Sequence, residues 1–169
     1  MKRLVIPVFA IGLTLASAVG AQVSYFDVML EDVGLRPGVT ADLNVRVFVN
    51  DSQPCQGRTV LLVPGAWGAA YPDWWMPFME AFFTDNPAGR NGCRVAILEL
   101  PGHGDSGLPD GGPLFGELGQ GDYAAALIGA LERLPDWGVK PKTILAYSMG
   151  GIVTALAQQA LVDQGTNLR

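Results

Sequence analysis

Three short, almost continuously apolar runs constrain the fold of this chain more than any other feature. The runs are Thr59 to Val63, Arg94 to Leu100 and Thr143 to Tyr147. Runs of this kind are typical of parallel strands that are buried on both faces. Between them, apolar residues recur at helical spacing, as in Trp74, Phe78 and Phe82. This alternation predicts an α/β fold, with a mostly parallel sheet and flanking helices.

Two further helices are expected in the second half of the chain. Tyr123, Leu127 and Leu131 recur at helical spacing after an N-cap expected at Asp122. After Ser148, a last apolar face is formed by Ile152, Val153, Leu156, Ala160 and Leu161. Both segments therefore fit helices that pack on the sheet.

A β-hairpin is expected before the first apolar run. Its strands are Tyr25 to Asp32 and Asp42 to Asn50, and the turn chemistry comes from Arg36-Pro37-Gly38. In the second strand, apolar residues at positions 43, 45, 47 and 49 alternate with Asn44, Arg46 and Phe48. This alternation has the period of two that predicts a β-strand.

The amino terminus reads as a secretory signal peptide. A basic head, Met1-Lys2-Arg3, precedes an apolar stretch from Leu4 to Val19 that is short for a membrane-spanning helix. We expect cleavage after Ala21, so that residues 22–169 form one domain of a secreted or periplasmic protein with no stable membrane span. A retained membrane anchor is the competing interpretation.

Composition excludes several classes of function. The chain has 11 basic and 16 acidic residues, without the clustered Lys and Arg of a nucleic-acid-binding surface. Cys55, Cys93 and His103 are the only cysteines and histidine, too few for a tetrahedral zinc site. We expect no nucleic-acid partner, no metal and no cofactor.

The sharpest motif is Ala146-Tyr147-Ser148-Met149-Gly150-Gly151, where an apolar run meets a helix. It resembles the nucleophile elbow of the α/β-hydrolase superfamily, with Ala146 in the first glycine position. The turn is tight, and the small residues Ala146 and Gly150 satisfy the space that it demands. A serine before glycines also often only caps a helix, so the motif needs support from other segments.

Two other segments supply that support, in family order. Val60 to Gly68 resembles the family's third strand and its oxyanion loop, and Glu99 to Gly107 resembles the loop after the fourth strand. The resemblance implies that Ser148 is the nucleophile and that the backbone N–H groups of Ala66 and Met149 form an oxyanion hole. The α/β-hydrolase resemblance covers roughly Val23 to the end of the chain.

The catalytic triad of the family is incomplete here. The family order is serine, acid, histidine, but residues 149–169 contain Asp163 and no histidine. We expect Asp163 to be a solvent-facing or terminal charge. The family's strand order places the third strand between the fourth and the fifth. The resemblance therefore implies that His103 begins two strand spacings, near 10 Å, from the elbow, whereas proton transfer needs roughly 3 Å. We therefore expect His103 to be a loop or pocket residue, and an improvised base is the alternative.

These features predict the amino-terminal part of a serine hydrolase that acts on a small-molecule ester or related acyl bond. The chain as given is expected to be inactive, and a non-catalytic binding module with the same fold is the alternative. The family places the strands after Cys55 and Cys93 side by side, which implies a disulfide between them. Core packing is expected of most of a set of aromatic residues, and some members could line an acyl pocket, with Trp67 and Tyr71 as the expected exceptions to core packing. The set is Trp67, Tyr71, Trp74, Trp75, Phe78, Phe82 and Phe83.

Overall fold

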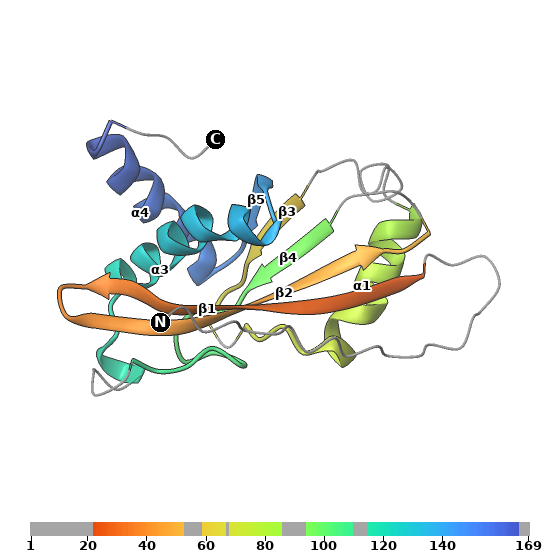
Figure 1. The fold of residues 1–169 in the computed structure, drawn as a ribbon, viewed down its shortest axis with the longest axis horizontal. Helices are drawn as coiled ribbons and strands as arrows, with labels where there is room; N and C mark the ends of the chain where they lie inside the picture. The colour runs from red at the N-terminus through yellow and green to blue at the C-terminus, as the bar shows by residue number, and fades with distance from the viewer. Residues whose placement is uncertain (1–21, 53–58, 67, 86–93, 110–114, 166–169) are drawn as a thin grey trace.

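The computed structural model describes residues 22–52, 59–66, 68–85, 94–109 and 115–165, which form one open sheet with helices packed on it (Figure 1). The strands are β1 (Val23–Arg36), β2 (Val39–Asn50), β3 (Thr59–Val63), β4 (Arg94–Leu98) and β5 (Pro141–Ala146). The helices are α1 (Pro72–Asp85), α3 (Gln120–Arg133) and α4 (Met149–Asp163), with short 3-10 turns η1 (Phe115–Glu117) and η2 (Leu134–Trp137). The predicted signal peptide and both cysteines lie outside the described residues.

The sheet has the strand order β1-β2-β4-β3-β5. β3 pairs in parallel with both β4 and β5, and β2 joins this core through antiparallel pairing with β4. The expected α/β fold is therefore confirmed, and so is the expectation that the third strand lies between the fourth and fifth. The loops that follow β3, β4 and β5 consequently leave the same edge of the sheet.

The opening hairpin is longer than the sequence predicts. β1 and β2 pair from Val23–Asn50 to Arg36–Val39, so that only Pro37 and Gly38 separate them. A bulge interrupts the pairing between Leu30 and Val33, where Asp32 has a φ of 54°. The Asp42 carboxylate accepts the Asp32 N–H at 2.8 Å, which stabilises this bulge. Polar residues in the bulge mask the strand pattern in the sequence.

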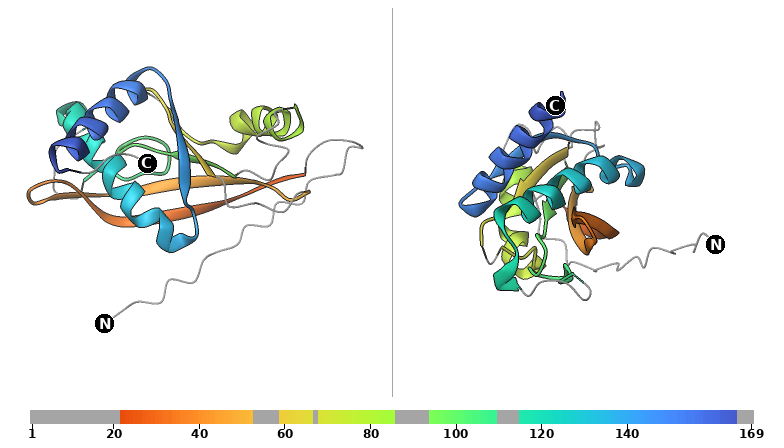
Figure 2. Two further views of the ribbon diagram at one scale, coloured as in Figure 1. Left: turned by 90° about the horizontal axis from the view of Figure 1, so that it is seen from above. Right: turned by 90° about the vertical axis from the view of Figure 1, so that its left-hand side faces the viewer.

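Helices cover both faces of the sheet, and the buried side chains divide between two clusters. α3 and α4 lie side by side (Figures 1 and 2) and share a core cluster with Leu61 and Val63 of β3. Met79 and Phe83 of α1 belong to a second cluster, with Leu62 of β3. Successive residues of β3 thus enter opposite clusters, which explains its continuously apolar sequence.

β5 is an edge strand, and this corrects one expectation. The run from Thr143 to Tyr147 predicts burial on both faces, but Leu145 and Tyr147 are about half exposed, at 54% and 48%. β3 pairs with only one side of β5, so the other side has no strand in the described part of the chain. The apolar side chains at this end of the sheet are therefore partly exposed.

The start of α3 also differs from the prediction. Asp122 was expected as the N-cap, but the helix begins at Gln120 and Gly119 is the N-cap. The Asp122 carboxylate lies in the first turn and accepts the Gly119 N–H at 2.9 Å, and Arg36 contacts it at 3.3 Å. The aspartate still stabilises the helix start, from inside the first turn. No helix among the described residues is long and apolar enough to cross a bilayer.

Candidate functional site

Ser148 occupies the junction between β5, which ends at Ala146, and α4, which begins at Met149. Its backbone has a φ of 54° and a ψ of −130°, in a region that costs an L-residue of the order of 1–3 kcal/mol. The Gly150 N–H donates to the Tyr147 carbonyl and the Gly151 N–H to the Ser148 carbonyl, both at 3.0 Å. The turn leaves Ser148 exposed at the start of α4.

The loop after β3 packs directly against this serine. A Cβ atom on Gly65 would lie 2.8 Å from the Ser148 Cβ and 3.1 Å from its Oγ, so only glycine fits there. The Gly68 N–H closes the loop by donating to the Gly65 carbonyl at 3.0 Å. Ala66 is exposed within this turn. The structure therefore brings the loop of Ala66 against Ser148.

Gly150 lets helix α4 approach β3 as closely as the loop does. A Cβ atom at this position would lie 2.1 Å from the Val63 carbonyl oxygen and 2.5 Å from that of Pro64. The Val63 oxygen also accepts the Tyr147 N–H at 3.4 Å. The demand for a small residue that the motif predicts at Gly150 thus has a defined steric cause.

A buried carboxylate holds the far end of the same loop. The Glu99 side chain is 0% exposed and accepts hydrogen bonds from the backbone N–H groups of Ala70 and Asp105 and from the Asn44 amide. The Asn44 amide contributes at 2.9 Å and the Asp105 N–H at 2.7 Å. This carboxylate joins strand β2, the loop after β4 and the loop after β3.

Arg46 supplies the positive charge beside this carboxylate. Its guanidinium donates to both oxygens of Asp27, at 2.7 and 2.8 Å, to Asp105 at 3.1 Å, and to the Ala70 carbonyl at 2.8 Å. Burial alone would lower the pKa of Arg46, but its hydrogen bonds to Asp27 and Asp105 and the charges of Asp27 and Glu99 raise that pKa above its ordinary value. The buried polar network therefore consists of Asn44, Arg46, Glu99 and the backbone of Ala70.

The sequence did not predict this network. Asn44 and Arg46 occupy the polar register of a period-two strand, which is ordinarily the solvent side, yet their exposed fractions are 1% and 6%. Phe48 stands in the same register and is 0% exposed. That aromatic residue is the sequence signal that both faces of β2 are covered.

His103 lies in the loop after β4 and is buried, with an exposed fraction of 4%. Its Nδ1 is 3.1 Å from the Pro101 carbonyl oxygen, and its ring packs edge-on against Tyr123 of α3 at 6.0 Å. These contacts agree with the expectation that His103 is a loop residue. Asp163 is exposed and is the last residue of α4, as expected. Within the described residues, no cluster of His, Cys, Asp and Glu is suited to a metal ion.

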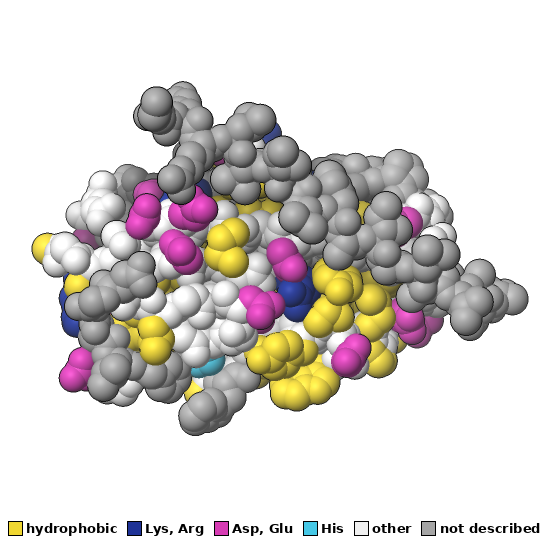
Figure 3. Space-filling view, turned by 60° about the horizontal axis from the view of Figure 1, so that its bottom comes forward, with side chains coloured by type: hydrophobic (Ala, Val, Ile, Leu, Met, Phe, Trp, Pro, Cys, Tyr) yellow, Lys and Arg dark blue, Asp and Glu magenta, His cyan; other side chains and the backbone are white. Residues whose placement is uncertain are grey.

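A pocket of about 300 Å³ reaches Tyr147, the residue before Ser148, and is lined by Gly68, Ala69, Trp74, Trp75, Phe78 and Tyr147. Core packing is confirmed for Phe83 and is wrong for Trp74 and Phe78, which are 69% and 48% exposed. They lie on the outward face of α1, because Met79 and Phe83 fill the inward face. Hydrophobic side chains gather in several exposed patches in Figure 3. Trp67 lies outside the described residues.

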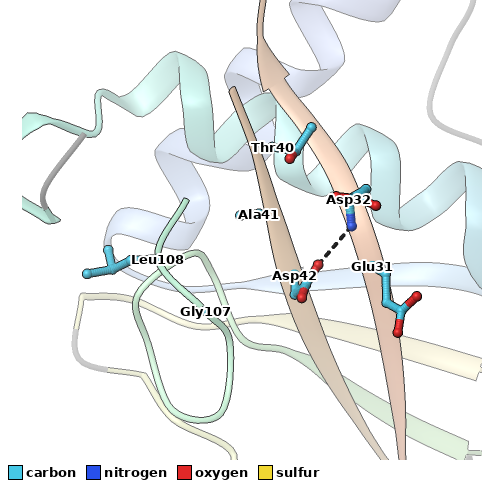
Figure 4. Close-up of a pocket in the computed structure, with 7 residues that line it drawn as sticks. All are labelled: Glu31, Asp32, Thr40, Ala41, Asp42, Gly107 and Leu108. Atoms are coloured by element: carbon cyan, nitrogen blue, oxygen red, sulfur yellow. Dashed lines mark hydrogen bonds between the residues drawn. The ribbon is translucent and has the colours of Figure 1, made fainter. Parts of the chain in front are cut away.

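A second pocket, of about 210 Å³, lies between the hairpin and the loop after β4 (Figure 4). Its acidic side chains are Glu31, Asp32 and Asp42, and Gly107 and Leu108 form the opposite wall. Asp42 is engaged with the bulge at Asp32, and its carbonyl accepts the Gly107 N–H at 3.0 Å. This pocket is accounted for by the hairpin and its bulge.

Three solved structures show the same fold at low identity. The structure of DcsB in complex with its substrate analogue has a TM-score of 0.57 and 18% identity, covering 85% of this chain and 43% of that one. The structure of Est1E from Butyrivibrio proteoclasticus with ferulic acid bound has a TM-score of 0.55 and 13% identity, covering 82% of this chain and 49% of that one. The structure of the esterase Est22 has a TM-score of 0.52 and 17% identity, covering 85% of this chain and 40% of that one. The chain spans less than half the length of each of these proteins.

No curated protein matches the sequence. The family model of the alpha/beta hydrolase family matches residues 60–167, which include the loop after β3, the loop after β4 and the Ser148 turn. The match agrees with the strand order and with the strand–turn–helix geometry at Ser148. This chain belongs to the alpha/beta hydrolase family.

Proposed function

We propose that the chain is part of a serine hydrolase that cleaves an ester or related acyl bond through an acyl-enzyme on Ser148. The observation that carries the proposal is the strained backbone of Ser148, which leaves the residue exposed while Gly65 packs against it. A strained turn between a strand and a helix is how α/β-hydrolases expose a nucleophile. A serine that only capped the helix would need no such strain.

In the proposed reaction, the Ser148 oxygen attacks the acyl carbonyl carbon and its proton passes to a histidine base. The carbonyl oxygen becomes an oxyanion, to which the N–H groups of Ala66 and Met149 donate. The start of α4 also favours negative charge there. The intermediate collapses and expels the alcohol, which takes the proton from the base. Water then hydrolyses the acyl-enzyme by the same steps.

The histidine base is proposed to come from sequence that follows Arg169 in a longer protein. His103 is engaged with Pro101 and Tyr123 in the loop after β4, two strands from β5 in the sheet. The chain as given should therefore show at most trace esterase activity. Residues 1–21 are proposed to direct the protein out of the cytoplasm, and small-molecule acyl compounds are its proposed substrates.

Hydrolysis of a short-chain p-nitrophenyl ester tests this function. A version extended through the missing half should be active and should lose at least about a thousandfold in kcat on Ser148→Ala. The matched control is Ser24→Ala, which removes an exposed hydroxyl from β1 and should leave the rate unchanged. Rapid turnover by the chain as given that His103→Ala abolished would overturn the assignment of the base.

The alternative, a binding module with this fold, makes the opposite prediction. An extended protein whose esterase rate ignored Ser148→Ala would contradict the nucleophile. A coding sequence that ended at Arg169 with a genuine stop codon would favour the binding module.

A further inference from the structure

We propose that the aromatic pocket beside Ser148 binds an aromatic acyl group, so that the preferred substrates are arylalkanoyl esters rather than aliphatic ones. The pocket is the one lined by Gly68, Ala69, Trp74, Trp75, Phe78 and Tyr147. This inference rests on the proposed function for the reaction at Ser148, but the pocket's preference can be measured by binding alone.

The first argument is the position of the pocket. Tyr147 lines it and immediately precedes Ser148, and a Cβ atom on Gly65 would lie 3.4 Å from the Tyr147 ring. Gly68 and Ala69 form another wall, and they follow Ala66 by two and three residues. An acyl carbonyl placed between Ser148 and the Ala66 loop would therefore direct its substituent toward this pocket.

The second argument is the chemistry of the walls. Among the described residues, no charged side chain lines the pocket. The indole N–H of Trp75 does not face a ligand, because it donates to the Ala69 carbonyl at 2.9 Å. This bond fixes the Trp75 ring to the loop, and Phe78 packs edge-on against that ring at 5.8 Å. The walls therefore offer rings, with no charge to complement, to whatever binds there.

The third argument is the exposure of rings that the fold does not use. Trp74 is 69% exposed and Phe78 is 48% exposed, while Met79 and Phe83 of the same helix fill the core. Tyr71 packs edge-on against Trp74 at 5.2 Å, which limits the orientations of the indole. Covering these rings with a ligand removes apolar surface from water. Core packing therefore does not account for these rings, whereas a bound ligand would cover them.

Size and ring geometry distinguish an aromatic acyl group from an aliphatic one. A cavity of about 150 Å³ accommodates benzene, and this pocket of about 300 Å³ leaves room for a ring with a short linker to the carbonyl. A ligand ring can also meet Trp74 and Phe78 edge to face, which an alkyl chain cannot. Two such contacts predict a preference of roughly tenfold over an alkyl chain of similar length.

The test measures binding of two acids to the chain as given, by ligand-observed NMR titration. The acids are 3-phenylpropanoate and hexanoate, which present a ring and an alkyl chain on a carboxylate. We expect 3-phenylpropanoate to bind about tenfold more tightly and Trp74→Ala to remove most of that ratio. The matched control is Trp137→Ala, an exposed tryptophan of η2, which should leave the ratio unchanged.

Equal binding of the two acids would overturn the proposal, and so would a loss in Trp74→Ala no larger than in Trp137→Ala. Trp74→Phe should restore part of the ratio, since it returns a ring to the wall. Ser148→Ala should bind both acids normally. A ring preference in an extended protein whose esterase rate is unchanged by Ser148→Ala would support the pocket proposal and contradict the proposed reaction.

Discussion

Two adjacent glycines at the start of α4 should respond to alanine in opposite directions. Gly150 is buried against β3, and a Cβ there would lie 2.1 Å from the Val63 carbonyl oxygen. Gly151 is the next residue of the same helical turn, and a Cβ there would meet nothing within 4 Å. The pair therefore separates the steric demand of the turn from the helix propensity that both positions share.

The magnitudes follow from the two environments. Alanine in place of glycine stabilises a helix by up to about 1 kcal/mol, and Gly151→Ala should gain up to this amount. A carbon and a carbonyl oxygen normally approach to about 3.3 Å, so Gly150→Ala must move two packed backbone segments apart by about 1 Å. Overpacking of this kind costs about 1–3 kcal/mol. Because the propensity gain applies to both positions, the two variants should differ by the overpacking cost alone, about 1–3 kcal/mol.

Urea unfolding of the parent chain and both variants measures this difference. The midpoint should fall in Gly150→Ala and rise or stay constant in Gly151→Ala, with the same m-value in all three proteins. A Gly150→Ala variant as stable as Gly151→Ala would refute the reasoning. It would mean that α4 does not approach the end of β3 as closely as the 2.1 Å contact requires.

The buried polar network, a buried phenol and the cysteines give three further predictions. Glu99→Gln should destabilise the chain by about 3 kcal/mol, because an amide N–H₂ replaces a hydrogen-bond acceptor; Asp27→Asn, at a 42% exposed side chain, should cost under about 1 kcal/mol in the same urea titration. Burial and then the Asp122 charge raise the pKa of Tyr123, so folding should weaken as pH rises above about 10, where the unfolded phenol ionises first. Thermal melts should show a shallower alkaline loss in Tyr123→Phe. Cys55 and Cys93 should resist alkylation in the exported, non-reduced protein, and a mass gain of two adducts would exclude the disulfide.

The sheet could be predicted because the burial of its central strands is visible in their own apolar sequences. Every residue from Thr59 to Val63 lies in a buried or half-buried position, so the run is apolar after Thr59 and its bounds match β3. The order of the three parallel strands followed from the family resemblance, which three motifs carry, each placed after a strand. β1 was harder, because the bulge at Asp32 interrupts the alternation that marks a strand. Its continuation to Arg36 depends on pairing with β2, which local sequence does not reveal.

Neither the polar network nor the identity of the aromatic residues that line the pocket could be predicted, for opposite reasons. Asn44 and Arg46 have partners that are distant in the sequence: Glu99 lies 55 positions after Asn44, and Asp105 lies 59 positions after Arg46. Trp74 and Phe78 have the spacing of a core face, and nothing local shows that Met79 and Phe83 take that role instead. Helical periodicity identifies a face, but the direction of that face depends on the sheet beneath it.

The two ends of the loop after β3 are fixed by different parts of the fold, and the proposed oxyanion donor lies between them. At one end, Gly65 packs against Ser148. At the other end, the Ala70 N–H is bound by Glu99 and the Ala70 carbonyl by Arg46. A shift of Ala66 would therefore break either a close steric contact or two buried polar ones. Catalysis by backbone N–H groups requires donors that are positioned before the charge develops. The proposed oxyanion hole would therefore be held in place by Arg46 of β2 and by Glu99, which directly follows β4.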